Sequence, residues 1–163
     1  MRHFKMKPLL VSALCVTALA ACGRGGGQEV GHVTTDWTGN EIKIEAVRDP
    51  DMPGIVCHMT YFDRSVIDRL RQGNWFEDPS NTSISCQRIG AIDLSHVNVR
   101  GQDEVFSHHQ SLFFKSVVVR RIFDIPNRSV LYVSHGREIV QGSAKMGISS
   151  VALTDDDLAT LLK

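Results

Sequence analysis

The stretch SLFFKSVVVRRIFD, residues 111–124, decides the fold of this chain. It is dense in β-branched and aromatic residues, which pack well on a pleated surface and favour strand over helix. The residues IPNR (125–128) have turn chemistry, and SVLYVSH (129–135) has the composition of a second strand. Together these segments predict an antiparallel hairpin.

Further strands are expected on both sides of this hairpin, because short apolar or alternating segments recur between turns rich in Gly, Pro and Asn. Gly39 and Asn40 separate the first two of these segments and predict a tight hairpin turn. A short segment at 103–107 has a weaker strand pattern. The remaining predicted strands are residues 29–37, 41–47, 55–62, 83–89 and 147–153.

One internal segment, residues 65–73, has the features of a short helix. Ser65 is a good N-cap and Gly73 a common helix stop. Within the segment, an apolar face is expected from Val66, Ile67 and Leu70.

A second helix is predicted at the C-terminus, where Thr154 precedes the acidic run 155–157. Acidic residues suit the first turn of a helix, and this interpretation is favoured over a cation site. The predicted fold is mainly β, with α+β as the alternative. It is a single compact antiparallel β-rich domain over residues 29–163, with one short internal helix and a C-terminal helix.

The first 21 residues have the three parts of a secretory signal peptide: a positive start, an apolar run and a small-residue end. The run is too short for a spanning helix, which needs about 20 apolar residues. A buried N-terminal helix is the alternative. Leu19 to Cys22 resembles the lipobox of bacterial lipoproteins. This resemblance implies cleavage before Cys22 and acylation of its thiol, whereas ordinary cleavage after Ala20 or Ala21 would release the chain.

After such cleavage, residues 22–28 are expected to comprise a lipid-bearing cysteine and a Gly-rich tether. We expect export to the periplasm, with the protein anchored to a membrane. The remaining chain has 142 residues (163 − 21), and without Arg2, Lys5 and Lys7 its net charge is 15 − 18 = −3. Nucleic acid is not an expected partner, because nucleic-acid binding needs a strongly basic face.

Cys57 and Cys86 are the cysteines that remain after Cys15 and Cys22 are set aside. An oxidising compartment favours a disulfide between them. It would close a loop of 30 residues, counting 57 to 86 inclusively, and would contribute roughly 3.6 kcal/mol in the chain-entropy model. A catalytic thiol is the alternative, but neither cysteine lies in a Cys-x-x-Cys motif.

No catalytic motif, nucleotide-binding loop or metal-binding spacing is recognised, so neither an enzyme, a cofactor nor a metal is expected. Lys115, Arg120 and Arg121 interrupt the most hydrophobic strand, and such charges need either a partner or an exposed face. Anion binding by Lys115, Arg120 and Lys145 is one hypothesis, and a solvated strand face is the simpler one.

Trp37 and Trp75 either line a sugar or peptide groove or, more commonly, pack in the core.

Several segments together resemble the CreA family of small exported proteins. They are residues 31–57, 83–94, 104–124 and 131–151, and they include Asp49-Pro50, Gly54 and Gly142-Ser143. Ala144 to Met146 departs from the Pro-Lys-Asn that usually follows Gly-Ser in the family. The resemblance implies an exported β-rich domain with a cysteine pair, but no activity. The leading hypothesis is a non-enzymatic module that binds an envelope protein or component, ahead of a periplasmic small-anion binder and an unrecognised enzyme.

Overall fold

The computed structural model describes residues 27–72, 82–106, 117–137 and 146–162. These ranges form a strand-rich domain with short helical segments, as predicted. The strands are β1 (Gln28–Thr34), β2 (Glu41–Arg48), β3 (Ile55–Asp63), β4 (Ser83–Arg88), β5 (Asp103–Glu104), β6 (Val117–Asp124), β7 (Ser129–Gly136) and β8 (Met146–Ala152). The helical segments are α1 (Val66–Gln72), α2 (Asp155–Ala159) and the 3-10 turn η2 (Thr160–Leu162).

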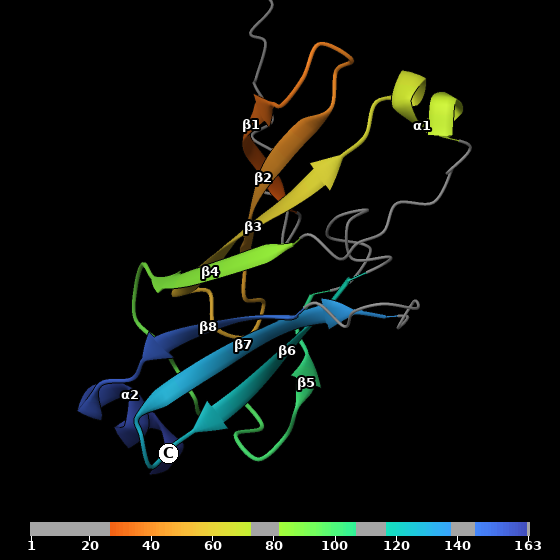
Figure 1. Cartoon of the computed structure of the whole chain (residues 1–163). Coiled ribbons are helices and arrows are strands. Elements are labelled where there is room, and N and C mark those ends of the chain that lie inside the picture. The colour runs from red at the N-terminus through yellow and green to blue at the C-terminus, as the bar shows by residue number, and fades with distance from the viewer. Residues whose placement is uncertain (1–26, 73–81, 107–116, 138–145, 163) are drawn as a thin grey trace, which may run out of the picture.

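The strands form two antiparallel sheets, ordered β1-β2-β3-β4 and β5-β6-β7-β8. Figure 1 shows them as an upper and a lower sheet, each following the order of the chain. The hairpin predicted from the sequence is β6–β7, paired from Val117↔Gly136 to Asp124↔Ser129. Residues 111–116 of the predicted strand lie outside the described residues.

The turn between β1 and β2 is longer than predicted. It spans residues 35–40, and Gly39 adopts a φ of 86°, which favours glycine. The Asp36 carboxylate accepts hydrogen bonds from the backbone N–H groups of Thr38 (2.9 Å) and Asn40 (3.2 Å). This local network stabilises a wider loop than the two-residue turn that Gly39 and Asn40 predict.

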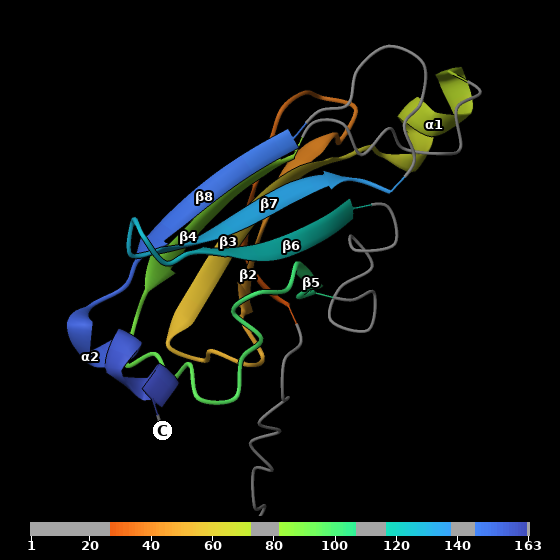
Figure 2. The same cartoon turned by 90° about the horizontal axis from the view of Figure 1, so that it is seen from below.

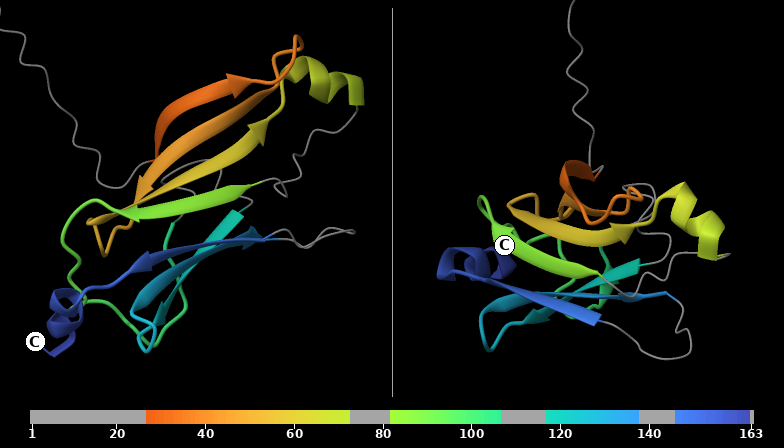
Figure 3. Two further views of the ribbon diagram at one scale, coloured as in Figure 1. Left: turned by 60° about the vertical axis from the view of Figure 1, so that its left-hand side comes forward. Right: turned by 45° about the horizontal axis from the view of Figure 1, so that its top comes forward.

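The two sheets share one hydrophobic core, to which both contribute buried side chains. Along one side, β4 lies beside β8, as Figures 1 and 3 show. The Cys86 N–H points away from β3 and donates to the Ser149 hydroxyl of β8 at 2.7 Å. A side-chain bond here takes the place of a backbone ladder between the sheets.

The helices α1 and α2 lie at opposite ends of the molecule (Figures 1 and 2). Thr154 caps α2, as predicted, and Asp157 completes a capping box with it. No helix among the described residues has the length and apolar character needed to cross a membrane.

The predicted apolar face of the internal helix exists, but it does not pack into the core. Val66, Ile67 and Leu70 are 67%, 59% and 59% exposed. The reason is topological: α1 follows the end of β3 that extends beyond the second sheet, so no described element covers this face (Figure 3).

Gly54 is a position where the backbone tolerates no side chain. A Cβ atom there would lie 2.0 Å from the Ala91 carbonyl oxygen, whereas a Cβ at Gly31 would have nothing within 4 Å. We expect Gly54→Ala to cost more than about 2 kcal/mol, because two backbone segments must separate. Gly31→Ala is the control, and urea unfolding of both variants is the measurement. Similar unfolding midpoints would show that the loop at Ala91 adapts without cost.

Asp157 fixes α2 to the first sheet through Arg88, whose Nη1 lies 3.1 Å from Asp157 Oδ1. The hydrogen bond from Arg88 is the main cause that lowers the pKa of Asp157 from 3.8 to about 2. The ionised form therefore adds stability that is complete above pH 3.8 and is lost as the pH falls toward 2.

We expect Asp157→Asn to lower the free energy of unfolding by about 1–2 kcal/mol at neutral pH. The difference from wild type should shrink as the pH falls from 4 to 2, because the wild-type carboxylate then becomes protonated. Urea titrations across this range measure it, with the exposed Asp156→Asn as control. A difference that stays constant with pH would argue against the ion pair.

Candidate functional site

Strand register aligns two rows of inward-facing residues, one on each sheet. Val47, Cys57 and Cys86 lie side by side across β2, β3 and β4. Arg121, Tyr132 and Ser149 lie side by side across β6, β7 and β8. The first row is apolar and the second polar, so the interface between the sheets contains a buried polar cluster.

The Cys57 and Cys86 sulfur atoms form a disulfide between neighbouring strands. Their Cα atoms are 3.9 Å apart, and the Cys86 N–H bonds to Ser149 rather than to β3. This geometry is that of a non-hydrogen-bonded antiparallel pair, where side chains approach most closely. Cys57 is fully buried and Cys86 is 8% exposed, so the disulfide belongs to the core.

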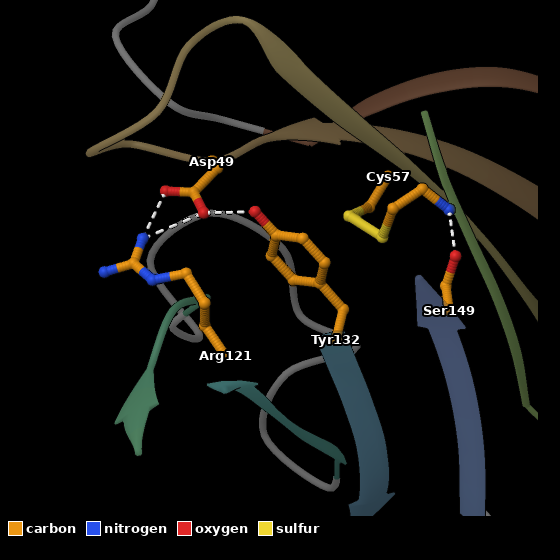
Figure 4. The surroundings of a disulfide bond; sticks show 6 residues. Asp49, Cys57, Arg121, Tyr132 and Ser149 are labelled. Carbon is orange, nitrogen blue, oxygen red and sulfur yellow. Dashed lines mark hydrogen bonds and ion pairs between the residues drawn. A yellow bond between two sulfur atoms is a disulfide. The ribbon is translucent and has the colours of Figure 1, made fainter. Parts of the chain in front are cut away.

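Asp49, just beyond β2, is the centre of the polar cluster (Figure 4). It has no exposed surface. The guanidinium Nη1 of Arg121 donates to both its carboxylate oxygens, at 2.8 and 2.9 Å, and the Tyr132 hydroxyl donates to Oδ2 at 2.6 Å. Backbone N–H groups of Asp51 and Met52 add bonds of 2.9 and 3.2 Å to Oδ1. Asp49 thus joins its own loop to two strands of the other sheet.

The surroundings of Arg121 and Tyr132 raise the pKa of both side chains. Burial opposes the charge on Arg121, but the carboxylates of Asp49 and Asp51 beside it together outweigh burial, so the pKa of Arg121 is raised. Burial, together with the same carboxylate, raises the pKa of the Tyr132 hydroxyl well above its usual range. Arg121 therefore stays a cation and Tyr132 a neutral donor at any physiological pH.

The geometry of this cluster fits a structural role rather than a catalytic one. Both carboxylate oxygens of Asp49 are occupied by donors, and Asp49, Arg121 and Tyr132 are each at most 2% exposed. A reacting group needs access to substrate, which this arrangement denies. Among the described residues no cluster of His, Cys, Asp and Glu is placed to hold a metal ion.

The two adjacent arginines of β6 lie on opposite sides of the sheet, because successive strand residues point to opposite faces. Arg121 faces the core and finds a partner. Arg120 lies on the outer face and donates from Nη1 to the Gln102 carbonyl oxygen at 3.0 Å. Lys115, Lys145 and the predicted acylation site Cys22 lie outside the described residues. Anion binding by Lys115, Arg120 and Lys145 stays a prediction.

Arg120 belongs to an apolar sheet surface that we call the β6–β8 outer face. Pairing aligns Arg120, Val133 and Ile148 in one row, and Ile122 with Leu131 in the next. Ile148 is 65% exposed and Met146 70%. The apolar side chains of this face are Val118, Ile122, Leu131, Val133, Met146 and Ile148, and Arg120, His135 and Ser150 lie among them.

Sequence reasoning anticipated that an arginine in this strand needs a partner but did not find Asp49 or Tyr132. Asp49 lies 72 positions from Arg121. The signal in the sequence was the two-residue period of the strand. This period places Arg121 on the same face as Val117 and Val119, which are fully buried.

We expect Arg121→Met to lower the free energy of unfolding by about 3–5 kcal/mol, because it leaves the Asp49 carboxylate buried without its cation. Arg120→Met, one residue away on the outer face, is the matched control and should change stability far less. Urea unfolding of both proteins is the measurement. Equal midpoints would contradict a supporting role for the Asp49–Arg121 pair.

Comparison with known proteins gives one consistent result. The family model described as CreA protein matches residues 30–156. Relatives named Protein CreA, from Escherichia coli strains K12, O6:H1 and O157:H7, are each 35% identical over 132 residues, covering 76% of this chain and 82% of theirs. No solved structure matches the chain significantly. The matched segment includes Asp49, Arg121 and both disulfide cysteines, and the chain belongs to the CreA family.

Proposed function

We propose that this protein is an exported, non-enzymatic binding module of the cell envelope. In this proposal residues 1–21 are a signal peptide, acyl chains on Cys22 hold the protein to a membrane facing the periplasm, and the domain binds another envelope protein. The observation that carries the proposal is the exposed apolar character of the β6–β8 outer face.

An antiparallel sheet with one face on the core normally presents polar residues on the other. The β6–β8 outer face departs from this rule, since Ile148 is exposed beside Val133 and Met146 is exposed beside His135. Contiguous apolar surface rimmed by polar groups marks protein interaction sites. Arg120 contributes a guanidinium at the edge, a group enriched at protein interfaces. The surface therefore fits a protein partner better than a small polar ligand.

Two features support export. The N-terminal sequence ends in Leu-Ala-Ala-Cys, and the core contains the Cys57–Cys86 disulfide, a bond that persists in oxidising compartments. Stable membrane attachment needs two acyl chains or more, as lipidation of Cys22 would supply. The burial of Asp49, Arg121 and Tyr132 supports a structural role for this cluster rather than a catalytic one.

Two measurements in cells test the halves of the proposal separately. A clickable fatty acid should label the wild-type protein, and Cys22→Ala should abolish the labelling. A photoreactive amino acid at position 148 should crosslink to a partner protein, whereas the same probe at the exposed Asp156, on α2, should not.

Val133→Asp adds a charge next to Ile148 without touching the core, so it should remove the crosslink from position 148. A wild-type protein without an acyl label would refute the anchor. Crosslinking that is equal at positions 148 and 156, or unchanged by Val133→Asp, would refute the binding face.

A further inference from the structure

We propose that the end of the domain formed by the β1–β2 loop and α1 rests in the interfacial layer of a lipid bilayer. We call this end the α1 tip, and it consists of Trp37, Val66, Ile67, Leu70 and Arg71. The inference rests on the proposed anchoring through Cys22, and it goes further because it assigns a second, protein-borne contact with the membrane.

The α1 tip is a continuous structural unit. The Ser65 N–H, at the start of α1, donates to Asn40 Oδ1 of the β1–β2 loop at 2.9 Å. Gly39 lies against Ser65, since a Cβ at Gly39 would be 3.7 Å from the Ser65 Cβ. At the other end of the unit, the Arg71 guanidinium lies 6.0 Å from the centre of the Trp37 ring. Loop and helix therefore present their side chains together.

The apolar side chains of the tip are directed to solvent. Trp37 is 87% exposed, and the three aliphatic residues of α1 are each more than half exposed. Tryptophan is enriched at membrane–water interfaces, where its ring is apolar and its N–H remains hydrated. A short helix with an apolar face and basic residues is typical of segments that lie in the interface plane.

The charge of the helix favours an anionic membrane surface. Among the described side chains of residues 64–72, Arg64 and Arg71 are basic and Asp68 is acidic. Asp68 lies 3.9 Å from Arg64 in an ion pair. Basic residues next to exposed apolar groups are attracted to anionic headgroups while their neighbours enter the interface.

The tether between Cys22 and β1 is short enough to keep the α1 tip close to the bilayer that holds Cys22. Cys22 precedes the first residue of β1, Gln28, by six positions, and six extended residues span at most about 20 Å. The seven residues of β1 run about 23 Å from Gln28 toward the tip. Because the two lengths are similar, a bilayer that holds Cys22 is also within reach of Trp37 when β1 lies at a shallow angle to it.

Trp37 provides a direct probe of this contact. The chain contains two tryptophans, and Trp75→Phe leaves Trp37 as the only one; Trp75→Tyr serves if the first variant folds poorly. The protein carrying this change is produced in cells with its own N-terminal sequence, so that Cys22 can be processed. It is then purified and reconstituted in vesicles of phosphatidylethanolamine and phosphatidylglycerol, with and without brominated acyl chains. We expect brominated lipid to quench Trp37, its emission to shift to the blue, and aqueous iodide to lose access to it.

Two matched variants identify the surface responsible. Ile67 and Ile148 have similar exposure, 59% and 65%, but lie on the α1 tip and on the β6–β8 outer face. Ile67→Asp should abolish quenching by brominated lipid and restore quenching by iodide, whereas Ile148→Asp should change neither. Trp37 that stays accessible to iodide, without quenching by brominated lipid, would overturn the inference.

Failure of the anchor and failure of the tip give different results. Mass spectrometry of the same preparation reports whether Cys22 is acylated. If the protein is acylated but Trp37 remains accessible to iodide, the anchor is retained and the tip contact is refuted. For a protein without acyl chains, the anchor is refuted, and added vesicles then decide the tip contact by the same quenching measurement.

Discussion

The carboxylate of Asp49 is the constraint on which the rest of the structure depends. It is buried between two sheets, and its donors come from its own loop, from β6 and from β7. A buried charge is tolerated only when such partners surround it. The bonds from Arg121 and Tyr132 to Asp49 therefore tie the loop after β2 to the second sheet, and the Cys86–Ser149 hydrogen bond joins β4 to β8.

Local sequence patterns were enough to predict the strands, the cap at Thr154 and a pairing of Cys57 with Cys86, because each depends on neighbouring residues or on compartment chemistry. Two features depend on how the sheets meet, which no local pattern records. The partner of Arg121 is one of them. The other is the apolar face of α1, which has the periodicity of a core helix and lies outside the core.

The apolar surfaces of the domain have a clear spatial arrangement. The α1 tip belongs to the first sheet, beside the β1–β2 loop, and the β6–β8 outer face belongs to the second sheet, on the side away from the core. Under the proposed anchoring, the first sheet is the one adjacent to the membrane. The second sheet then presents Ile148 and its neighbours away from the bilayer, where a periplasmic partner can reach them.

The bonds that join the sheets also bear on when the chain folds. Cys86 to Ser149, Asp49 to Arg121 and Asp49 to Tyr132 span 63, 72 and 83 positions. Contacts between residues so far apart in sequence form slowly. In a reducing cytosol the Cys57–Cys86 bond would also be missing. A newly made chain would thus remain unfolded longer, which would favour the membrane translocation that the proposed export requires.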